Sequence, residues 1–344
     1  MPQRSRVSLD DIASLDTLTA AFWQASRGKR SKQDVQRFSA QLDAEFAHLR
    51  GDILLGRAPE GRWTSFRIFD PKPRLILAPC FRDRVLHHAM MIPMGPVLER
   101  ALVADTFACR PGKGTLAAVL RVQHHLRRFP WFVKADCRAY FASIDHAILR
   151  SILSRRFKDP GLLALCDRVL DRAPVNAGTG SPQPSRRGLP IGALSSQYFA
   201  NTYLDGLDRF LLEKLRVRAM VRYMDDIVWW CDTRPMAEDT LAEARDFVAR
   251  ERSIELKPDA RVARSAEGLA FLGFRVLPGV RRLLLRRRRR YAAARARWER
   301  AFMEGSVDGL GLQTGYSAAL AVTAHADAVA FRRAELMRRP PVDA

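Results

Sequence analysis

Two adjacent carboxylates inside an apolar stretch restrict the possible folds of this chain more than any other feature. Asp225 and Asp226 lie within residues 221–230, which are otherwise rich in apolar and aromatic side chains. Such a pattern predicts a buried hairpin with the acidic pair at its turn. Neighbouring carboxylates repel each other and lose hydration on burial, so a fold tolerates them mainly when a cation lies between them. Mg²⁺ and Mn²⁺ prefer such oxygen ligands. A plain polar turn is the alternative, because Asp is common in turns.

Composition narrows the class of protein. A hydrophobic fraction of 47% over 344 residues predicts a globular chain of two or three packed subdomains. No apolar run is long enough for a membrane span, and the first residues lack the apolar stretch of a signal peptide. The net charge of +21 indicates a polyanionic partner, with nucleic acid ahead of an acidic membrane surface. The five cysteines form no Cys-x-x-Cys pair, which predicts reduced thiols and a cytoplasmic location.

The spacing of apolar residues predicts a mixed α+β chain, because helical periods alternate with short buried or alternating runs. The clearest shift in composition comes near residue 280, where the chain becomes Arg-rich. The expected helices cover 9–50 (broken at 28–30), 81–103, about 115–128, a stretch from about 144, a long stretch that follows 189–192 and runs to about 215, and 235–252. The other expected elements are a hairpin over 63–77, a strand over 131–136, a loop over 173–188, a strand or hairpin over 269–276, and mostly helix from 281.

A third carboxylate, Asp136, ends the expected strand 131–136. If that strand lies beside the acidic hairpin, Asp136 faces Asp225 and Asp226. Three carboxylates so placed hold two Mg²⁺ ions about 4 Å apart, the arrangement used for in-line phosphoryl or nucleotidyl transfer.

These motifs together resemble those of reverse transcriptases. Asp136-x-x-x-Tyr140-Phe141 is similar to the first metal motif of that family, and Tyr223-Met224-Asp225-Asp226 is similar to its second. Among the other matching motifs are the segment that contacts template and nucleotide (192–197), the later lysine motif (Lys257) and the primer-gripping hairpin (271–274). The resemblance covers roughly residues 65–275 and implies an RNA-directed DNA polymerase.

The resemblance also implies an architecture. It is an α+β right-hand polymerase with fingers, a palm built on an antiparallel sheet, and a helical, Arg-rich thumb. Residues 1–62 are then an N-terminal helical extension, 63–276 the fingers and palm, and 277–344 the thumb.

A narrower similarity comes from the segment before the acidic hairpin. Most reverse transcriptases carry Gln-Gly there and end the motif in Ser-Pro, whereas this chain has Ile191-Gly192 and ends in Ser196-Gln197. This is similar to the reverse transcriptases of diversity-generating retroelements. The resemblance implies a bacterial or phage-encoded enzyme that copies a template RNA with errors at template adenines during mutagenic retrohoming. It also implies a small, basic, oligomeric accessory protein as partner.

The resemblance assigns a role to each candidate site residue. Two Mg²⁺ ions, or Mn²⁺ in their place, are held by Asp136, Asp225 and Asp226, which are also the catalytic residues. The dNTP is contacted by Lys72, Arg74, Tyr140, Phe141 (the steric gate), Ile191, Gly192, Gln197 and Lys257. Template RNA and the cDNA/RNA hybrid are contacted by Arg110, Tyr223, Met224, Phe271, Gly273, Arg286, Arg287, Arg288, Arg289 and Arg290.

Two rival functions stay open at this level. Bacterial reverse transcriptases of similar size act in antiphage defence and make cDNA from a non-coding RNA. A non-catalytic RNA-binding scaffold is a rival of a different class, against which the complete set of aspartates argues. The run Arg286 to Arg290 charges every face of a helix, which suits a phosphate backbone and otherwise a basic face for a protein partner.

Overall fold

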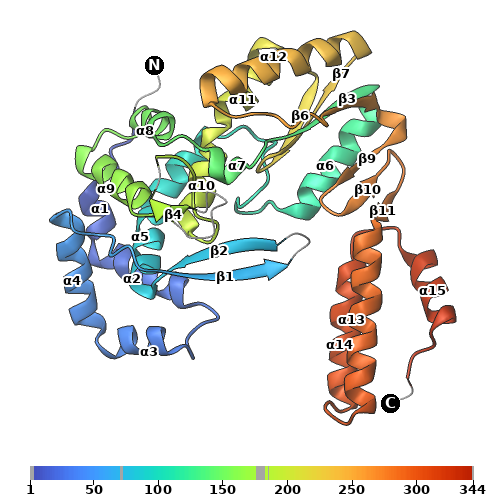
Figure 1. The fold of residues 1–344 in the computed structure, drawn as a ribbon, viewed down its shortest axis with the longest axis horizontal. Coiled ribbons are helices and arrows are strands. Elements are labelled where there is room, and N and C mark those ends of the chain that lie inside the picture. Colours follow the sequence, from blue (N-terminus) through green and yellow to red (C-terminus); the bar gives the residue numbers. More distant parts are fainter. Residues whose placement is uncertain (1–3, 70–72, 176–182, 185, 343–344) are drawn as a thin grey trace.

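The computed structural model describes residues 4–69, 73–175, 183–184 and 186–342. Over these residues the predicted mixture of helices and antiparallel sheets is confirmed. Figure 1 shows the chain running from N-terminal helices at one end to C-terminal helices at the other, with the largest sheet between them. No helix in this part of the chain combines the length and the apolar character that a bilayer crossing requires. All five cysteines have free thiols, as predicted.

The largest sheet carries the acidic hairpin. Its strand order is β6-β7-β3-β8, and all neighbours are antiparallel. Asp226, the first residue of β7, lies opposite Tyr223 on β6 and opposite Asp136 on β3. The predicted hairpin and the predicted strand 131–136 are therefore confirmed, and they are hydrogen-bonded neighbours. The strands are β3 (Trp131–Asp136), β6 (Ala219–Tyr223), β7 (Asp226–Cys231) and β8 (Arg261–Arg264).

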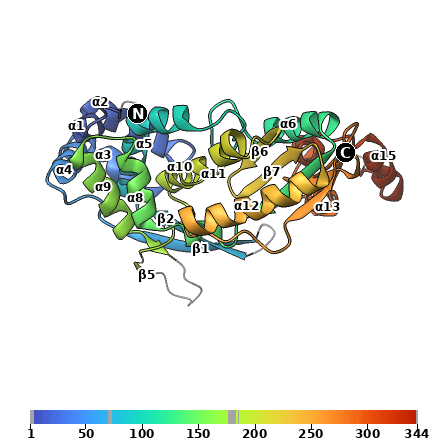
Figure 2. The same cartoon turned by 90° about the horizontal axis from the view of Figure 1, so that it is seen from above.

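Alternate side chains of this sheet enter two separate cores. Trp229 faces α12 (Arg234–Arg252), where its indole N–H donates to Thr240 Oγ1 at 3.0 Å. Trp230 faces the opposite core, which includes α6 (Thr115–Arg128). Figure 2 shows these two helices on opposite sides of the sheet. Burial on both faces explains why the strands around the aspartates are apolar almost throughout.

The N-terminal region differs from its prediction in detail. Residues 9–50 form parts of four helices rather than two, because the chain breaks at Ser14 and Gln41 as well as near Gly28. Ser14 has extended backbone and its hydroxyl accepts from Thr17 N–H, so it caps a new helix. The elements up to residue 128 are α1 (Leu9–Ala13), α2 (Leu15–Ser26), α3 (Gln33–Ala40), α4 (Leu42–Leu54), β1 (Trp63–Phe69), β2 (Pro73–Pro79), α5 (Phe81–Ala101) and α6.

The single long helix expected up to residue 215 is also divided. The α-helix is regular only to Tyr203, whose carbonyl accepts from Arg252 Nε at 2.9 Å instead of continuing the helix. Within 173–188, expected as a loop, two short strands pair, and residues 176–182 and 185 lie outside the described residues. The elements here are α7 (Tyr140–Ser143), α8 (His146–Ser154), α9 (Pro160–Asp171), β4 (Pro174–Val175), β5 (Gln183–Pro184), α10 (Leu194–Tyr203), α11 (Asp205–Arg209) and a π-helical turn (Phe210–Lys214).

The C-terminal region begins with a small sheet and continues as helices. β9 (Leu269–Phe271) and β10 (Phe274–Val276) form the expected hairpin, and β11 (Arg281–Leu283) pairs with β10. Two helices then pack together, and a Cβ on Gly315 would lie only 2.2 Å from the Trp298 ring, so the glycine permits their close approach. The helices are α13 (Leu285–Met303), α14 (Gly309–Thr323) and α15 (Val329–Arg338).

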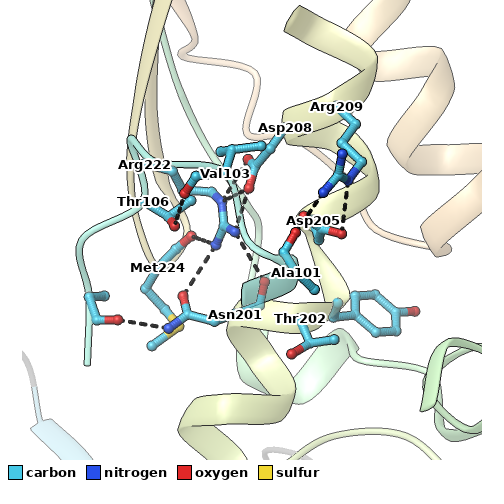
Figure 3. Close-up of polar contacts among 12 residues, drawn as sticks. Ala101, Val103, Thr106, Asn201, Thr202, Asp205, Asp208, Arg209, Arg222 and Met224 are labelled. Atoms are coloured by element: carbon cyan, nitrogen blue, oxygen red, sulfur yellow. Dashed lines mark hydrogen bonds and ion pairs between the residues drawn. The ribbon is translucent and has the colours of Figure 1, made fainter. Parts of the chain in front are cut away.

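A fully buried ion pair fastens the acidic hairpin to the helices beneath it. Arg222 on β6 and Asp208 on α11 are both 0% exposed, and the guanidinium donates to both carboxylate oxygens at 2.6 to 3.0 Å. The same guanidinium donates to the Asn201 carbonyl and to the Met224 carbonyl, at 3.0 and 3.2 Å (Figure 3). A buried charge left without its partner is costly, whereas a buried apolar pair often is not.

We therefore predict that Asp208→Ala lowers the free energy of unfolding by about 3–5 kcal/mol, because it leaves the Arg222 charge unpaired in the core. Asp208→Leu combined with Arg222→Met should recover most of that loss. Urea unfolding followed by circular dichroism measures both. Asp232→Ala is the matched control, since its ion pair with Arg218 lies on the surface and should contribute little. Equal destabilisation by Asp208→Ala and Asp232→Ala would contradict the prediction.

Candidate active site

The structure brings the three predicted aspartates to one edge of the sheet. Met224 and Asp225 form a two-residue turn between β6 and β7, and Met224 has a left-handed backbone with φ of 60°. Left-handed backbone costs a non-glycine residue roughly 1–2 kcal/mol. The Arg222 contact with the Met224 carbonyl helps to hold this turn. Asp225 therefore stands at the tip, while Asp226 and Asp136 face each other across the strand pair.

The aspartates form an unfavourable cluster of negative charge. Burial raises the pKa of Asp225, and the neighbouring Asp136 carboxylate raises it further. Burial also raises the pKa of Asp226 to about 6, with Asp136 and Asp225 adding to the shift and Lys134 opposing it. The ionised form of both carboxylates is therefore disfavoured, and a nearby positive charge would stabilise it.

Two lysines supply positive charge to the cluster. Lys257 Nζ lies 2.7 Å from Asp136 Oδ2, and its backbone N–H donates to the Asp136 carbonyl at 2.8 Å. Burial lowers the pKa of Lys257, but the hydrogen bond to Asp136 and the charges of Asp136, Asp225 and Asp259 together outweigh burial, so the pKa lies above its usual range. Lys134 Nζ lies 3.4 Å from Asp226 Oδ1, within ion-pair distance. Lys257 was predicted to be near the site, whereas Lys134 was not.

The donor atoms suit a hard divalent cation. Asp136 Oδ1 and Asp226 Oδ1 are buried and have no hydrogen-bond partner among the described residues. Within the described ranges, however, no three acidic, histidine or cysteine side chains close around a single point. Asp136, Asp225 and Asp226 are the residues that would hold a cation, and Asp136 would then exchange its contact with Lys257 for the ion.

The β1–β2 hairpin contributes a positive charge near the aspartates. Arg74 on β2 is exposed, and its charge lowers the pKa of Asp225 against the effect of burial. The β2 backbone also binds the segment before α10, since Leu77 N–H donates to the Ile191 carbonyl at 2.8 Å. Gly192 has φ of 137°, and a Cβ there would lie 2.4 Å from the Leu77 carbonyl oxygen. Lys72 lies outside the described residues.

Other residues predicted to contact the dNTP have mixed environments. Phe141 is half-buried at the base of α7, and Gln197 is half-buried on α10. Tyr140 is buried at 3% exposure, and its hydroxyl donates to the Ala200 carbonyl. Tyr140 therefore connects α7 to α10, and its side chain does not reach the surface where a nucleotide would bind.

The residues predicted to contact nucleic acid are similarly divided. Tyr223 and Met224 are half-buried beside the aspartates. Phe271 is 1% exposed and belongs to the core, so it cannot present its ring to a primer in this arrangement. Gly273 lies at the β9–β10 turn, with φ of 88°, against the Arg287 side chain. The Arg110 guanidinium donates to Glu99 at 2.6 Å and to the Val103 carbonyl, contacts that hold the chain before α6.

The arginine run occupies the start of α13. Arg287 packs over the Phe274 ring at 4.1 Å, and Arg288 packs over Phe331 at 5.5 Å. Arg286, Arg289 and Arg290 are exposed. Part of the run Arg286 to Arg290 therefore packs against aromatic rings, and the rest forms a charged surface.

We predict that Gly192→Ala destabilises the protein by about 1–3 kcal/mol and separates the Ile191 segment from β2, because the added methyl overlaps the Leu77 carbonyl. Thermal unfolding and limited proteolysis of β1–β2 measure the effect. Gly279→Ala is the control, since a Cβ there would meet nothing within 4 Å. A Gly192→Ala protein as stable and as protease-resistant as Gly279→Ala would show that the close approach is unimportant.

Several known proteins are similar to this chain. Residues 69–276 match the family "Reverse transcriptase (RNA-dependent DNA polymerase)". Protein YkfC of Escherichia coli (strain K12) is 24% identical over 298 residues, which cover 74% of this chain and 75% of that protein. The group II intron-encoded protein LtrA of Lactococcus lactis subsp. cremoris is 25% identical over 142 residues, covering 41% of this chain and 23% of LtrA. A solved structure of apo telomerase from Candida tropicalis aligns with a TM-score of 0.46 and 12% identity, over 66% of this chain and 56% of that one.

The family match spans all three aspartates, the Ile191-Gly192 segment and Lys257. It also covers more than half of the chain. The predicted resemblance is therefore confirmed at the level of the family. The chain belongs to the reverse transcriptase family and is an RNA-directed DNA polymerase.

Proposed function

We propose that this polymerase copies a template RNA into cDNA at the edge of the sheet formed by β3, β6 and β7. The observation that carries the proposal is the meeting of Asp136, Asp225 and Asp226, with raised pKa values at Asp225 and Asp226, at one sheet edge. Divalent cations bound there would activate the primer 3′-hydroxyl and stabilise the departing pyrophosphate.

The residues of the chain itself position the reactants. The Met224-Asp225 turn, held by Arg222, fixes the carboxylates relative to β3 before substrate arrives. Arg74 projects from β2 as a planar donor suited to triphosphate oxygens. Lys257 carries a proton 2.7 Å from Asp136 and can deliver it to pyrophosphate once that contact is released. Phe141, half-buried on α7, would limit space for a 2′-hydroxyl.

The proposed function divides the chain into the parts of a right-hand polymerase. In this reading β1–β2 belongs to the fingers, the β6-β7-β3-β8 sheet is the palm, and α13 to α15 form the thumb. Figure 1 shows the β1–β2 ribbon pointing toward the α13–α14 pair. An RNA–DNA hybrid between them would meet the exposed Arg286, Arg289 and Arg290. Binding through these phosphate contacts should weaken steeply with salt.

Within the reverse transcriptase family, we assign this enzyme to a diversity-generating retroelement, with a basic accessory protein as its partner. It rests on Ile191, which replaces a hydrogen-bonding Gln beside the nucleotide position. The Ile191 carbonyl is fixed on β2 and Gly192 admits no side chain, so the Ile191 side chain is held in a defined position. An aliphatic group there can stabilise a nucleotide by contact only, which weakens discrimination between correct and incorrect pairs.

Primer extension tests the polymerase site. With a primed RNA template, dNTPs and Mg²⁺, the wild type should extend the primer, and Asp225→Asn should lose at least about 10³-fold in rate because a metal ligand is removed. Asp232→Asn, which changes an exposed aspartate directly after the other end of β7, should extend normally. If Asp225→Asn and Asp232→Asn extend the primer equally well, the site is not at this turn.

Ile191→Gln tests the retroelement assignment. The substitution restores a hydrogen-bonding side chain and should lower misincorporation opposite template adenine by about tenfold, with smaller effects at other bases. Sequencing of cDNA from the two enzymes on one template measures this. Ile191→Leu should keep the wild-type error rate. An unchanged adenine error rate in Ile191→Gln would argue against the assignment.

A further inference from the structure

Lys134 is a charged residue in the middle of β3, and the sequence predicts no role for it. It lies two residues before Asp136, so both side chains point to the same face of the sheet. Phe132, two residues further back, enters the core that contains Phe271 and Phe274 of the β9–β10 hairpin. The hairpin therefore covers the face on which Lys134 and Asp136 stand.

The contacts of Lys134 join two parts of the site. Its Nζ donates to the Ala270 carbonyl on β9 at 2.7 Å and lies 3.4 Å from Asp226 Oδ1. It also stands 6.0 Å from the centre of the Phe271 ring, within the range of a cation–π contact. One ammonium group thus links the hairpin backbone to a carboxylate of the cluster.

No strand ladder joins β9–β10 to β3. The two belong to separate sheets, among the residues that the structure describes. Apolar packing, which is non-directional, holds the hairpin over the sheet. A hydrogen bond from Gln123 Nε2 to the Leu277 carbonyl, at 3.1 Å, ties the end of the hairpin that is far from its turn to α6. A charge-assisted hydrogen bond is directional, so the Lys134–Ala270 contact fixes the height and register of the hairpin turn at Leu272 and Gly273.

We propose that Lys134 is a positioning residue that sets where the β9–β10 hairpin holds the primer end relative to Asp226. This inference deepens the proposed function and rests on it, together with the primer contact that the family resemblance implies for the hairpin at Gly273. Lys134 has three donor hydrogens, so it can bind the Ala270 carbonyl and Asp226 together. When the aspartates hold cations, the Ala270 contact remains available.

The test compares Lys134→Met with Arg261→Met. Arg261 is the cross-strand partner of Lys134 on β8, and its guanidinium contacts Glu267 rather than the aspartates. Hydrogen exchange of the metal-free protein should show faster exchange over residues 269–276 in Lys134→Met and wild-type exchange there in Arg261→Met. In primer extension, Lys134→Met should raise the KM for primed template about tenfold and change the KM for dNTP little. Lys134→Arg should restore most of the primer affinity.

The outcomes separate the two proposals. Failure of the wild type to extend a primer would remove the proposed function, whatever the exchange data show. If the wild type extends and Lys134→Met matches Arg261→Met in both exchange and primer KM, Lys134 is not a positioning residue. Equal increases in the KM for primer and for dNTP, without faster exchange in the hairpin, would also overturn it. If Lys134→Met fails to fold, Lys134→Arg and Lys134→Gln carry the comparison, since only Arg keeps the charge.

Discussion

The buried contact between Arg222 and Asp208 organises the centre of this molecule. It joins β6 to α11, and through Asn201 and the Met224 carbonyl it reaches α10 and the acidic turn (Figure 3). Backbone bonds of Arg222 with Asp105 and Phe107 also close the outer edge of β6, which would otherwise offer unpaired groups. Because a buried guanidinium requires all these acceptors, it fixes several elements at once. The geometry of the acidic turn therefore depends on the core and not only on the two residues that form the turn.

That support is needed because the turn is locally unfavourable. Met224 adopts a left-handed backbone, and carboxylates with raised pKa values stand beside each other. Lys257 and Lys134 supply partial compensation, each through one aspartate. Strain and uncompensated charge concentrated in a site are typical of pre-organised catalytic centres, where the missing stabilisation is provided by substrate or metal. The same two lysines also connect the aspartates to neighbouring segments. Lys257 binds Asp136 from the segment before β8, and Lys134 binds the β9 backbone.

The sequence predicts the candidate site residues better than the contacts that hold them. Asp136, Asp225 and Asp226 are found from strand patterns and spacing, because a carboxylate at the end of an apolar strand is a local signal. Lys134 carries a similar signal, two residues from Asp136 on the same strand face, but it was not among the predicted site residues. The partnership of Arg222 with Asp208 has no such signal, since only the packing of α11 under β6 brings them together. Tyr140 and Phe271 show the limit of motif resemblance, which gives residue identity but not side-chain direction, and both are buried.

The central claim is that the edge of the β6-β7-β3 sheet holds divalent cations between Asp136 and Asp225. Anomalous diffraction from crystals grown with Mn²⁺, primed RNA template and a non-hydrolysable dNTP tests it most directly. We expect a strong Mn²⁺ peak within coordination distance of both carboxylates, with Lys257 released from Asp136. Crystals that contain bound primer and nucleotide but show Mn²⁺ only elsewhere, with the Lys257–Asp136 contact intact, would contradict it.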